Sequence, residues 1–101
     1  MSTRANTDTA TKTKTSTTTP PMYKVMLLND DYTTWDFVVE VLMTVFKKDE
    51  MEADRITRDV HHIGIGVAGI YSFEIAETKT EMANRLAFEN GHPLQCVMEP
   101  E

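Results

Sequence analysis

Two apolar segments separated by a polar elbow organise the first half of the chain. The run Tyr23–Leu28 is rich in strand-forming residues and is mostly apolar on both faces, which predicts a central strand. Three Asx residues follow at positions 29–31, and such side chains favour turns because they bond their own backbone. Apolar positions then recur with the period of a helix over residues 34–46, with Thr33 as its cap and Asp36 as the capping-box partner.

The middle of the chain predicts a second helix and a second strand. Asp49, with Glu52 three residues later, caps a helix over residues 50–61, and glycines end it. An apolar stretch over Val67–Ile75 predicts the strand. Glycines in this region weaken a strand, and they mark either a bulge or the close approach of another element.

The last part of the chain completes a small α/β (α+β) sandwich. Thr78 with Glu81 predicts the start of a third helix, and Asn90-Gly91 predicts its end. Leu94–Glu99 alternates as a final strand. The order is strand, helix, helix, strand, helix, strand, which predicts a three-stranded, mostly antiparallel sheet packed on three helices.

Composition changes along the chain. Residues 1–21 contain nine threonines, a net charge of +2 and no Val, Ile, Leu, Phe, Tyr or Trp. Such a segment buries too little apolar surface to offset the entropy of ordering, so we predict a disordered extension over residues 1–21 and one folded domain over residues 22–101. From composition the extension is either a passive leader or an arm that a partner uses.

Charge and cysteine content restrict the function. The net charge of −6 argues against nucleic acid and anionic membranes as main partners. The single cysteine, Cys96, forms no internal disulfide and is expected as a buried thiol, which fits a reducing compartment such as the cytoplasm. No apolar run approaches the roughly 18 residues of a membrane span, and no secretory signal is expected at the N-terminus.

The candidate chemistry lies in the elbow and at the end of the second helix. Asn29, Asp30 and Asp31 form the elbow, and His61 and His62 lie where the second helix ends. A hairpin of the two helices would bring His61 to face the elbow. In the plainest interpretation, the Asx residues only form a turn and the histidines only complement the helix dipole.

Two functional interpretations remain beside this one. The first is a metal site formed by His61, His62 and Asp30. It is disfavoured because adjacent helical histidines diverge by ~100° and no His-x-x-x-His motif or cysteine pair is present. The second is recognition of an ammonium group, since Asn29, Asp30 and His61 together accept three or more hydrogen bonds. An apolar surround would favour capture of a chain's amino terminus.

Catalysis has little support in the residues. No Ser/His/Asp or Cys/His pattern stands in a recognisable context, and the glycines at positions 64, 66 and 69 lack the Lys-Ser/Thr of a phosphate loop. From the residues alone, Glu74, Glu77 and Lys79 are the solvated charges of a strand end and a helix start.

Three segments resemble the ClpS family, the bacterial adaptors of the Clp protease. They are YKVMLLNDDYTTWDFVV, VHHIGIGVAGIYSFEIAETK and ENGHPLQC, and the resemblance covers residues 21–99. It implies an adaptor rather than an enzyme, without cofactors and monomeric. Such an adaptor binds N-degrons, which begin with Phe, Tyr, Trp or Leu, and delivers them to the N-terminal domain of the ClpA unfoldase in ClpAP. ClpS proteins also carry a mobile N-terminal extension.

The resemblance also implies roles for individual residues. Asn29, Asp30 and His61 would hold the substrate's amino group, which agrees with the ammonium acceptors reached above, while Asp31 would shape the elbow. Glu74 and Lys79 would face ClpA. The side chain of the first substrate residue would enter a pocket lined by Thr33, Trp35, Val38, Thr57, Val60 and Leu94.

Two pocket positions depart from the family pattern. Trp35 and Thr57 stand where the family commonly has methionine, so we expect a changed pocket shape and a narrowed preference among bulky first residues. Two rivals stay open. One is a partner-only modulator of ClpA whose pocket is closed by Trp35, and the other is a metal-dependent enzyme that uses His61 and the elbow carboxylates.

Overall fold

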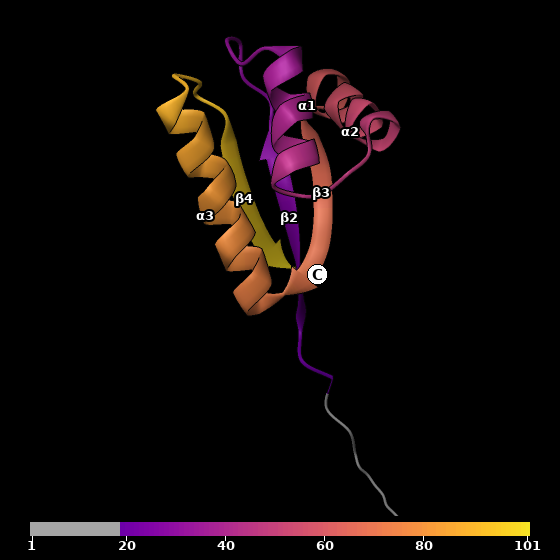
Figure 1. Ribbon diagram of the computed structural model, residues 1–101. Helices are drawn as coiled ribbons and strands as arrows, with labels where there is room; N and C mark the ends of the chain where they lie inside the picture. The colour runs from indigo at the N-terminus through magenta and orange to yellow at the C-terminus, as the bar shows by residue number, and fades with distance from the viewer. Residues whose placement is uncertain (1–18) are drawn as a thin grey trace, which may run out of the picture.

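The computed structural model describes residues 19–101 and confirms the predicted order of elements. The elements, shown in Figure 1, are β2 (Met22–Leu28), α1 (Trp35–Thr44), α2 (Glu50–Ile63), β3 (Ile65–Ser72), α3 (Phe73–Glu89) and β4 (Gln95–Pro100). Disorder was predicted for residues 1–21. Of these, residues 1–18 lie outside the described residues.

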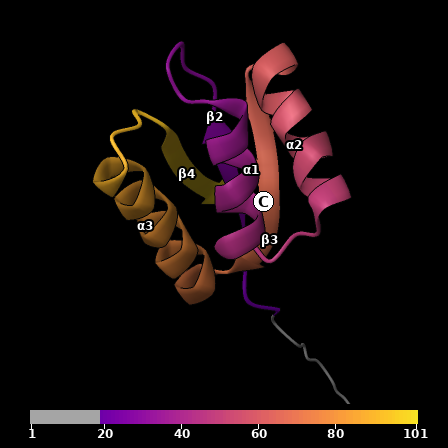
Figure 2. The same ribbon diagram turned by 45° about the horizontal axis from the view of Figure 1, so that its top comes forward.

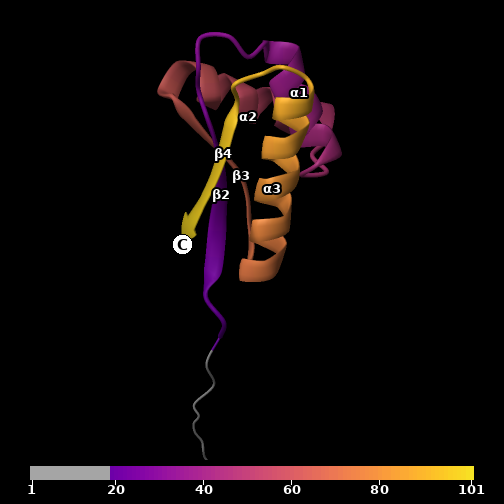
Figure 3. The same ribbon diagram turned by 90° about the vertical axis from the view of Figure 1, so that its left-hand side faces the viewer.

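The sheet has the order β3-β2-β4, and both pairings are antiparallel. β2 is therefore the central strand, as its apolar composition predicts. Val25 and Leu27 of β2 are fully buried in the core beside Val41 and Leu42 of α1. In Figure 3 the sheet is seen nearly edge-on, and α1 and α3 lie on the same side of it. Figure 2 shows α1 between α3 and α2.

The side chain of Asn84 ties α3 to the edge strand β4. Its amide nitrogen donates to the Cys96 carbonyl at 3.0 Å, and its amide oxygen accepts the Cys96 N–H at 2.8 Å. These two bonds satisfy backbone groups at the sheet edge, where no further strand from residues 19–101 pairs. Cys96 is buried, as predicted, and its burial raises the pKa of the thiol to about 12.

The boundary between β3 and α3 differs from the sequence-based expectation. The predicted strand Val67–Ile75 is shifted, because β3 ends at Ser72 and α3 begins at Phe73. The predicted capping box of Thr78 and Glu81 is therefore wrong. Phe73 and Ile75 are about half exposed in the first helical turn, although their alternation with polar residues resembles a strand. The Phe73 ring packs edge-to-face with Tyr23, with ring centroids 5.2 Å apart, and this contact anchors the start of the helix.

The glycines of β3 mark both a bulge and a close approach. The register shifts between Val25 and Met26, which pair with Gly69 and Val67. At Gly66, an added Cβ would lie 2.6 Å from Val60 Cγ2 and 2.9 Å from the Ile56 carbonyl. Gly66 therefore lets α2 pack directly on β3, and this packing sets the position of the helix that carries His61.

Replacing Gly66 by alanine should separate α2 from β3. The added methyl group meets a backbone carbonyl, so we expect the free energy of unfolding to fall by about 1–3 kcal/mol, as for other overpacked sites. Urea denaturation measures this loss. The control is Val67→Thr, a change on the exposed face of the same strand, which should alter stability by less than ~0.5 kcal/mol. Equal stability of Gly66→Ala and the wild type would contradict the close approach.

Candidate functional site

Backbone hydrogen bonds bring the elbow and the end of α2 together. The Asn29 N–H donates to the Gly64 carbonyl at 3.0 Å, directly beyond the pair Leu28 and Ile65 that ends the β2–β3 ladder. Gly64 ends α2 in the left-handed conformation, with φ of 100°, and its N–H donates to the Val60 carbonyl at 3.1 Å. The elbow and the His61 end of α2 therefore lie at the same end of the sheet.

The carboxylate of Asp30 organises the elbow. Its Oδ1 accepts the N–H groups of Tyr32 and Thr33 at 2.8 and 2.7 Å, and its Oδ2 accepts the Thr33 hydroxyl at 2.7 Å. An ionised carboxylate offers about four acceptor sites, so one site remains for a ligand. The elbow is thus shaped by Asp30 itself, and Asp31, to which that task was ascribed from sequence, is exposed.

Hydrogen bonds keep Asp30 ionised. Partial burial acts to raise the pKa of its carboxyl, but the hydrogen bonds from Thr33 and Tyr32, helped by the nearby His92, outweigh burial and lower the pKa below its ordinary value of 3.8. The carboxylate therefore carries a full negative charge at neutral pH, which suits the binding of a cation.

The His61 ring is oriented by α2 and by Trp35. Its Nδ1 lies 3.1 Å from the Thr57 carbonyl, and because a carbonyl only accepts, Nδ1 carries the proton. Nε2 of the neutral ring is then an acceptor. The Trp35 ring lies over His61, with centroids 5.1 Å apart, and its Nε1–H donates to Asp54 Oδ1 at 3.4 Å. Trp35 of α1 thus bridges to α2 at two points.

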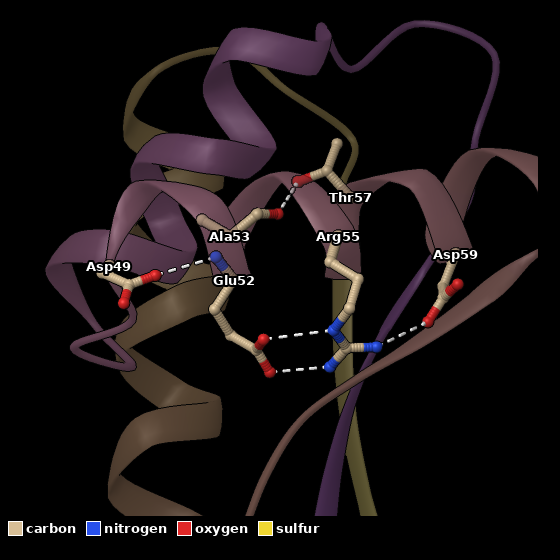
Figure 4. A network of polar contacts seen from close by, with 6 residues as sticks. All are labelled: Asp49, Glu52, Ala53, Arg55, Thr57 and Asp59. Atoms are coloured by element: carbon tan, nitrogen blue, oxygen red, sulfur yellow. Dashed lines mark hydrogen bonds and ion pairs between the residues drawn. The ribbon is translucent and has the colours of Figure 1, made fainter.

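Five of the six residues predicted to line the side-chain pocket are buried. They are Thr33, Val38, Thr57, Val60 and Leu94, and Trp35 is 37% exposed. They come from the elbow, α1, α2 and the segment before β4. The Thr57 hydroxyl donates to the Ala53 carbonyl at 2.7 Å, so this buried polar group is satisfied within its own helix (Figure 4).

The outer face of α2 is occupied by its own ion pairs. Arg55 donates to both carboxylate oxygens of Glu52, at 2.7 and 3.1 Å, and lies 3.5 Å from Asp59. Figure 4 shows these side chains pointing away from Thr57. The charge of Arg55 is thereby balanced within the helix, on the side away from the candidate site.

His92 lies close enough to Asp30 to help lower the pKa of its carboxyl, and no sequence pattern indicated this position. The helix stop at Asn90-Gly91 is a Schellman motif, in which the His92 N–H donates to the Ala87 carbonyl at 2.9 Å. Gly91 has the required positive φ of 76°. The His92 ring stacks on Phe37 of α1, with centroids 4.1 Å apart. The Asn90-Gly91 signal predicted the helix end at this point, but nothing in the sequence indicated that His92 stacks on Phe37.

Within residues 19–101, no three His, Cys, Asp or Glu side chains gather closely enough to hold a metal ion. No helix in that range is long and apolar enough to span a membrane.

The two residues predicted to face ClpA differ in exposure. Glu74 is exposed, whereas Lys79 is half-buried and its ammonium is turned onto the end of α1. A hollow of about 250 Å³ lies between α1 and α3, lined by Thr44, Val45, Met82, Arg85, Leu86 and Glu89.

Comparisons with known proteins converge on one family. Residues 18–97 match the family model of the ATP-dependent Clp protease adaptor protein ClpS. The ClpS adapter of Acetivibrio thermocellus is 56% identical over 82 residues, which cover 81% of this chain and 83% of that protein. The ClpS adapter of Desulfotalea psychrophila is 47% identical over 98 residues, or 97% and 96% of the two chains.

A solved structure is also similar. It is ClpS2 of Agrobacterium tumefaciens bound to L-phenylalaninamide, and it superposes with a TM-score of 0.80 at 44% identity. The match covers 82% of this chain and all of that one. Strands, helices and their order are therefore shared with an experimentally determined fold.

The hydrogen bond from Thr33 to Asp30 gives a test of the elbow. Thr33→Val removes the hydroxyl but leaves both backbone bonds, so the pKa of Asp30 should rise from its lowered native value. An NMR titration of the carboxyl carbon measures it, with Thr78→Val on the exposed face of α3 as control. An unchanged Asp30 titration would contradict the arrangement.

The lowered pKa of Asp30 also determines how the stability of Thr33→Val should change with pH. Because the native pKa lies below 3.8, the stabilisation by the Asp30 charge is complete above that pH and is lost as the pH falls through the native pKa. Thr33→Val should therefore be less stable than the wild type at neutral pH, and the difference should shrink in acid. A difference that grows in acid would contradict this account.

Proposed function

This chain belongs to the ClpS family of Clp protease adaptors, and from that premise we propose that it is an N-degron adaptor. It binds the free amine and the bulky apolar first residue of substrates that begin with Phe, Tyr, Trp or Leu. It then delivers them to the ClpA unfoldase of ClpAP. The observation that carries the proposal is the ionised Asp30 carboxylate at the same end of the sheet as the acceptor Nε2 of His61.

The amine is held by three acceptors. An α-ammonium group donates three hydrogen bonds, and the acceptors are the side-chain oxygen of Asn29, the remaining site on Asp30 and Nε2 of His61. Asp30 also supplies the opposite charge, which strengthens these bonds. The similar ClpS2 of Agrobacterium tumefaciens is bound to L-phenylalaninamide, a small molecule with a free α-amine and a phenyl side chain, and this likeness supports the proposal.

The first side chain is read by the buried wall of Thr33, Val38, Thr57, Val60 and Leu94, with Trp35 at its mouth. Burying a Leu or Phe side chain is worth ~1.5–3 kcal/mol, and each hydrogen bond to the charged amine adds roughly 1.5–3 kcal/mol. Association costs several kcal/mol in lost freedom. We therefore expect a dissociation constant in the ~micromolar range. Val and Ile should be rejected, since a branch at their β-carbon meets the pocket mouth.

Delivery uses a different face of the domain. We assign ClpA docking to the start of α3, with Glu74 as an exposed contact and Lys79 as a second one, and we assign a role in transfer to the extension over residues 1–21. The protein acts as a monomer without a cofactor. The single cysteine fits a reducing compartment, so the proposal includes the cytoplasm as its location.

A partner-only modulator of ClpA is the second candidate. One observation favours it, namely that the Trp35 indole lies over His61 and also bonds Asp54 on α2. If this bridge holds in solution, it closes the path to the amine site. The metal-dependent enzyme has no comparable support within residues 19–101.

Single substitutions test amine binding. Fluorescence anisotropy of a labelled peptide that begins with Phe gives the affinity of the wild type and of Asn29→Ala, Asp30→Asn and His61→Ala. Each variant should bind about 10- to 150-fold more weakly, because Asn29→Ala and His61→Ala each lose an acceptor for the charged amine, and Asp30→Asn loses the opposite charge. His62→Ala is the matched control, because it changes the next, exposed histidine. Unchanged binding in all three variants would overturn the amine site.

A peptide panel tests the altered pocket. Peptides that differ only in the first residue are ranked for the wild type and for Trp35→Met combined with Thr57→Met. We expect the wild type to accept fewer of Phe, Tyr, Trp and Leu, because an indole is bulkier and stiffer than a methionine side chain. Identical rankings would contradict a narrowed preference. Binding that appears only in Trp35→Ala would favour the partner-only modulator.

A further inference from the structure

Lys79 makes a long-range contact that its position in the sequence does not reveal. It lies on α3, yet its Nζ donates to the Val45 carbonyl at 2.7 Å, a residue 34 positions earlier. Val45 is the C-cap residue of α1. Figures 1 and 2 both show α3 running beside α1. Lys79 therefore connects the helix assigned to docking with a helix that carries the binding site.

The surroundings of Lys79 favour a cation at this point. Its Nζ lies 5.5 Å from the ring centroid of Tyr71 and 6.0 Å from that of Phe46, within the range of cation–π attraction. The C-terminus of a helix carries a partial negative charge, and the last turn of α1 contains no basic residue of its own. Lys79 supplies a cation there from another element, in addition to Lys47 and Lys48, which follow the C-cap in the chain.

The turn that follows α1 adds to the need for an anchor. Lys47 has a φ of 59°, a left-handed conformation that is uncommon for a residue with a side chain. The next N–H, of Lys48, reaches back to the Leu42 carbonyl at 3.0 Å. The end of α1 is thus a strained turn, and the charge-assisted bond from Lys79 holds it from outside.

The other end of α1 forms part of the proposed binding site. Trp35 is its first residue, and Val38 lies one turn later in the buried wall. α1 has 10 residues, and a helix of that length is about 15 Å long. A loosened C-terminal end would therefore tilt the wall at the N-terminal end.

We propose that Lys79 is a positioning residue that anchors the C-terminal end of α1 and thereby fixes the pocket wall at the other end of the helix. The effect on substrate binding rests on the proposed N-degron function, whereas the anchoring does not. A docking contact alone would leave the isolated protein unchanged when the ammonium is removed. The anchoring makes Lys79 important before any unfoldase is present.

The test compares Lys79→Met with the wild type in the absence of any unfoldase. Methionine keeps an apolar stem and removes the ammonium. Amide hydrogen exchange should become roughly 5- to 30-fold faster at residues 45–48, because that turn opens more easily. A labelled peptide that begins with Phe should bind several-fold more weakly. Lys79→Arg, which keeps a charged donor, should restore much of the protection.

Glu77→Gln is the control, since Glu77 lies on the same helix two residues before Lys79 and its side chain is exposed. It should change neither exchange at residues 45–48 nor peptide binding. If Lys79→Met does not fold, Lys79→Gln, which keeps a neutral N–H donor, replaces it.

The outcomes separate the inference from the function on which it partly rests. Exchange at residues 45–48 that equals the wild type in Lys79→Met would overturn the anchor. Faster exchange with unchanged peptide affinity would overturn its link to the pocket. If the wild type binds no peptide with any first residue, the proposed function fails by itself, and the exchange result alone decides whether Lys79 anchors α1.

Discussion

The candidate site depends on how β2 and β3 end. Their antiparallel ladder runs to Leu28 and Ile65 and is extended by the bond from the Asn29 N–H to the Gly64 carbonyl. This pairing places Asn29, which follows β2, beside Gly64, which precedes β3. Since Gly64 caps α2, the elbow after β2 and the His61 end of α2 lie at the same end of the sheet. These backbone hydrogen bonds, together with the close packing of α2 on β3 at Gly66, bring two distant segments of sequence to the same end of the sheet.

Asp30 links the local structure to the chemistry. The same carboxylate that closes the turn through Tyr32 and Thr33 keeps a site for a ligand, and the bonds that order it also keep it charged. A surface aspartate held only by water would be mobile, and holding it for a ligand would cost side-chain entropy. In this fold, three hydrogen bonds already order the Asp30 carboxylate, so this acceptor is preorganised.

The order of elements was predictable because turn and capping residues mark the ends of most helices and strands in this chain. Asn29 to Asp31 mark the elbow, Asp49 accepts the Glu52 N–H at 2.8 Å as the cap of α2, and Asn90-Gly91 end α3. The predicted cap of α1 was wrong by one residue, because Thr34 and not Thr33 accepts the Phe37 N–H, at 3.1 Å. The start of α3 was not predictable in this way. Ser72 makes no side-chain capping bond, so local signals were weak, and the alternation of Phe73 and Ile75 favoured a strand.

Contacts between residues far apart in the sequence could not be predicted from local sequence patterns. The stacking of His92 on Phe37, the bridge from Trp35 to Asp54 and the bond from Lys79 to Val45 each join elements whose relative placement is set by packing. Similarity of motifs indicated the candidate residues Asn29, Asp30 and His61, but it gave no reason for their arrangement. That reason is the ladder end, the helix cap at Gly64 and the close packing at Gly66.

The central claim is that a free amine binds between the elbow and the end of α2. The most direct measurement is a two-dimensional NMR titration of the labelled protein with L-phenylalaninamide and with its N-acetylated form. We expect saturable shifts of the backbone signals of Asn29, Asp30, His61 and Leu94 with the free amine, and none with the acetylated form. Equal shifts with both compounds, or shifts confined to the hollow between α1 and α3, would contradict the claim.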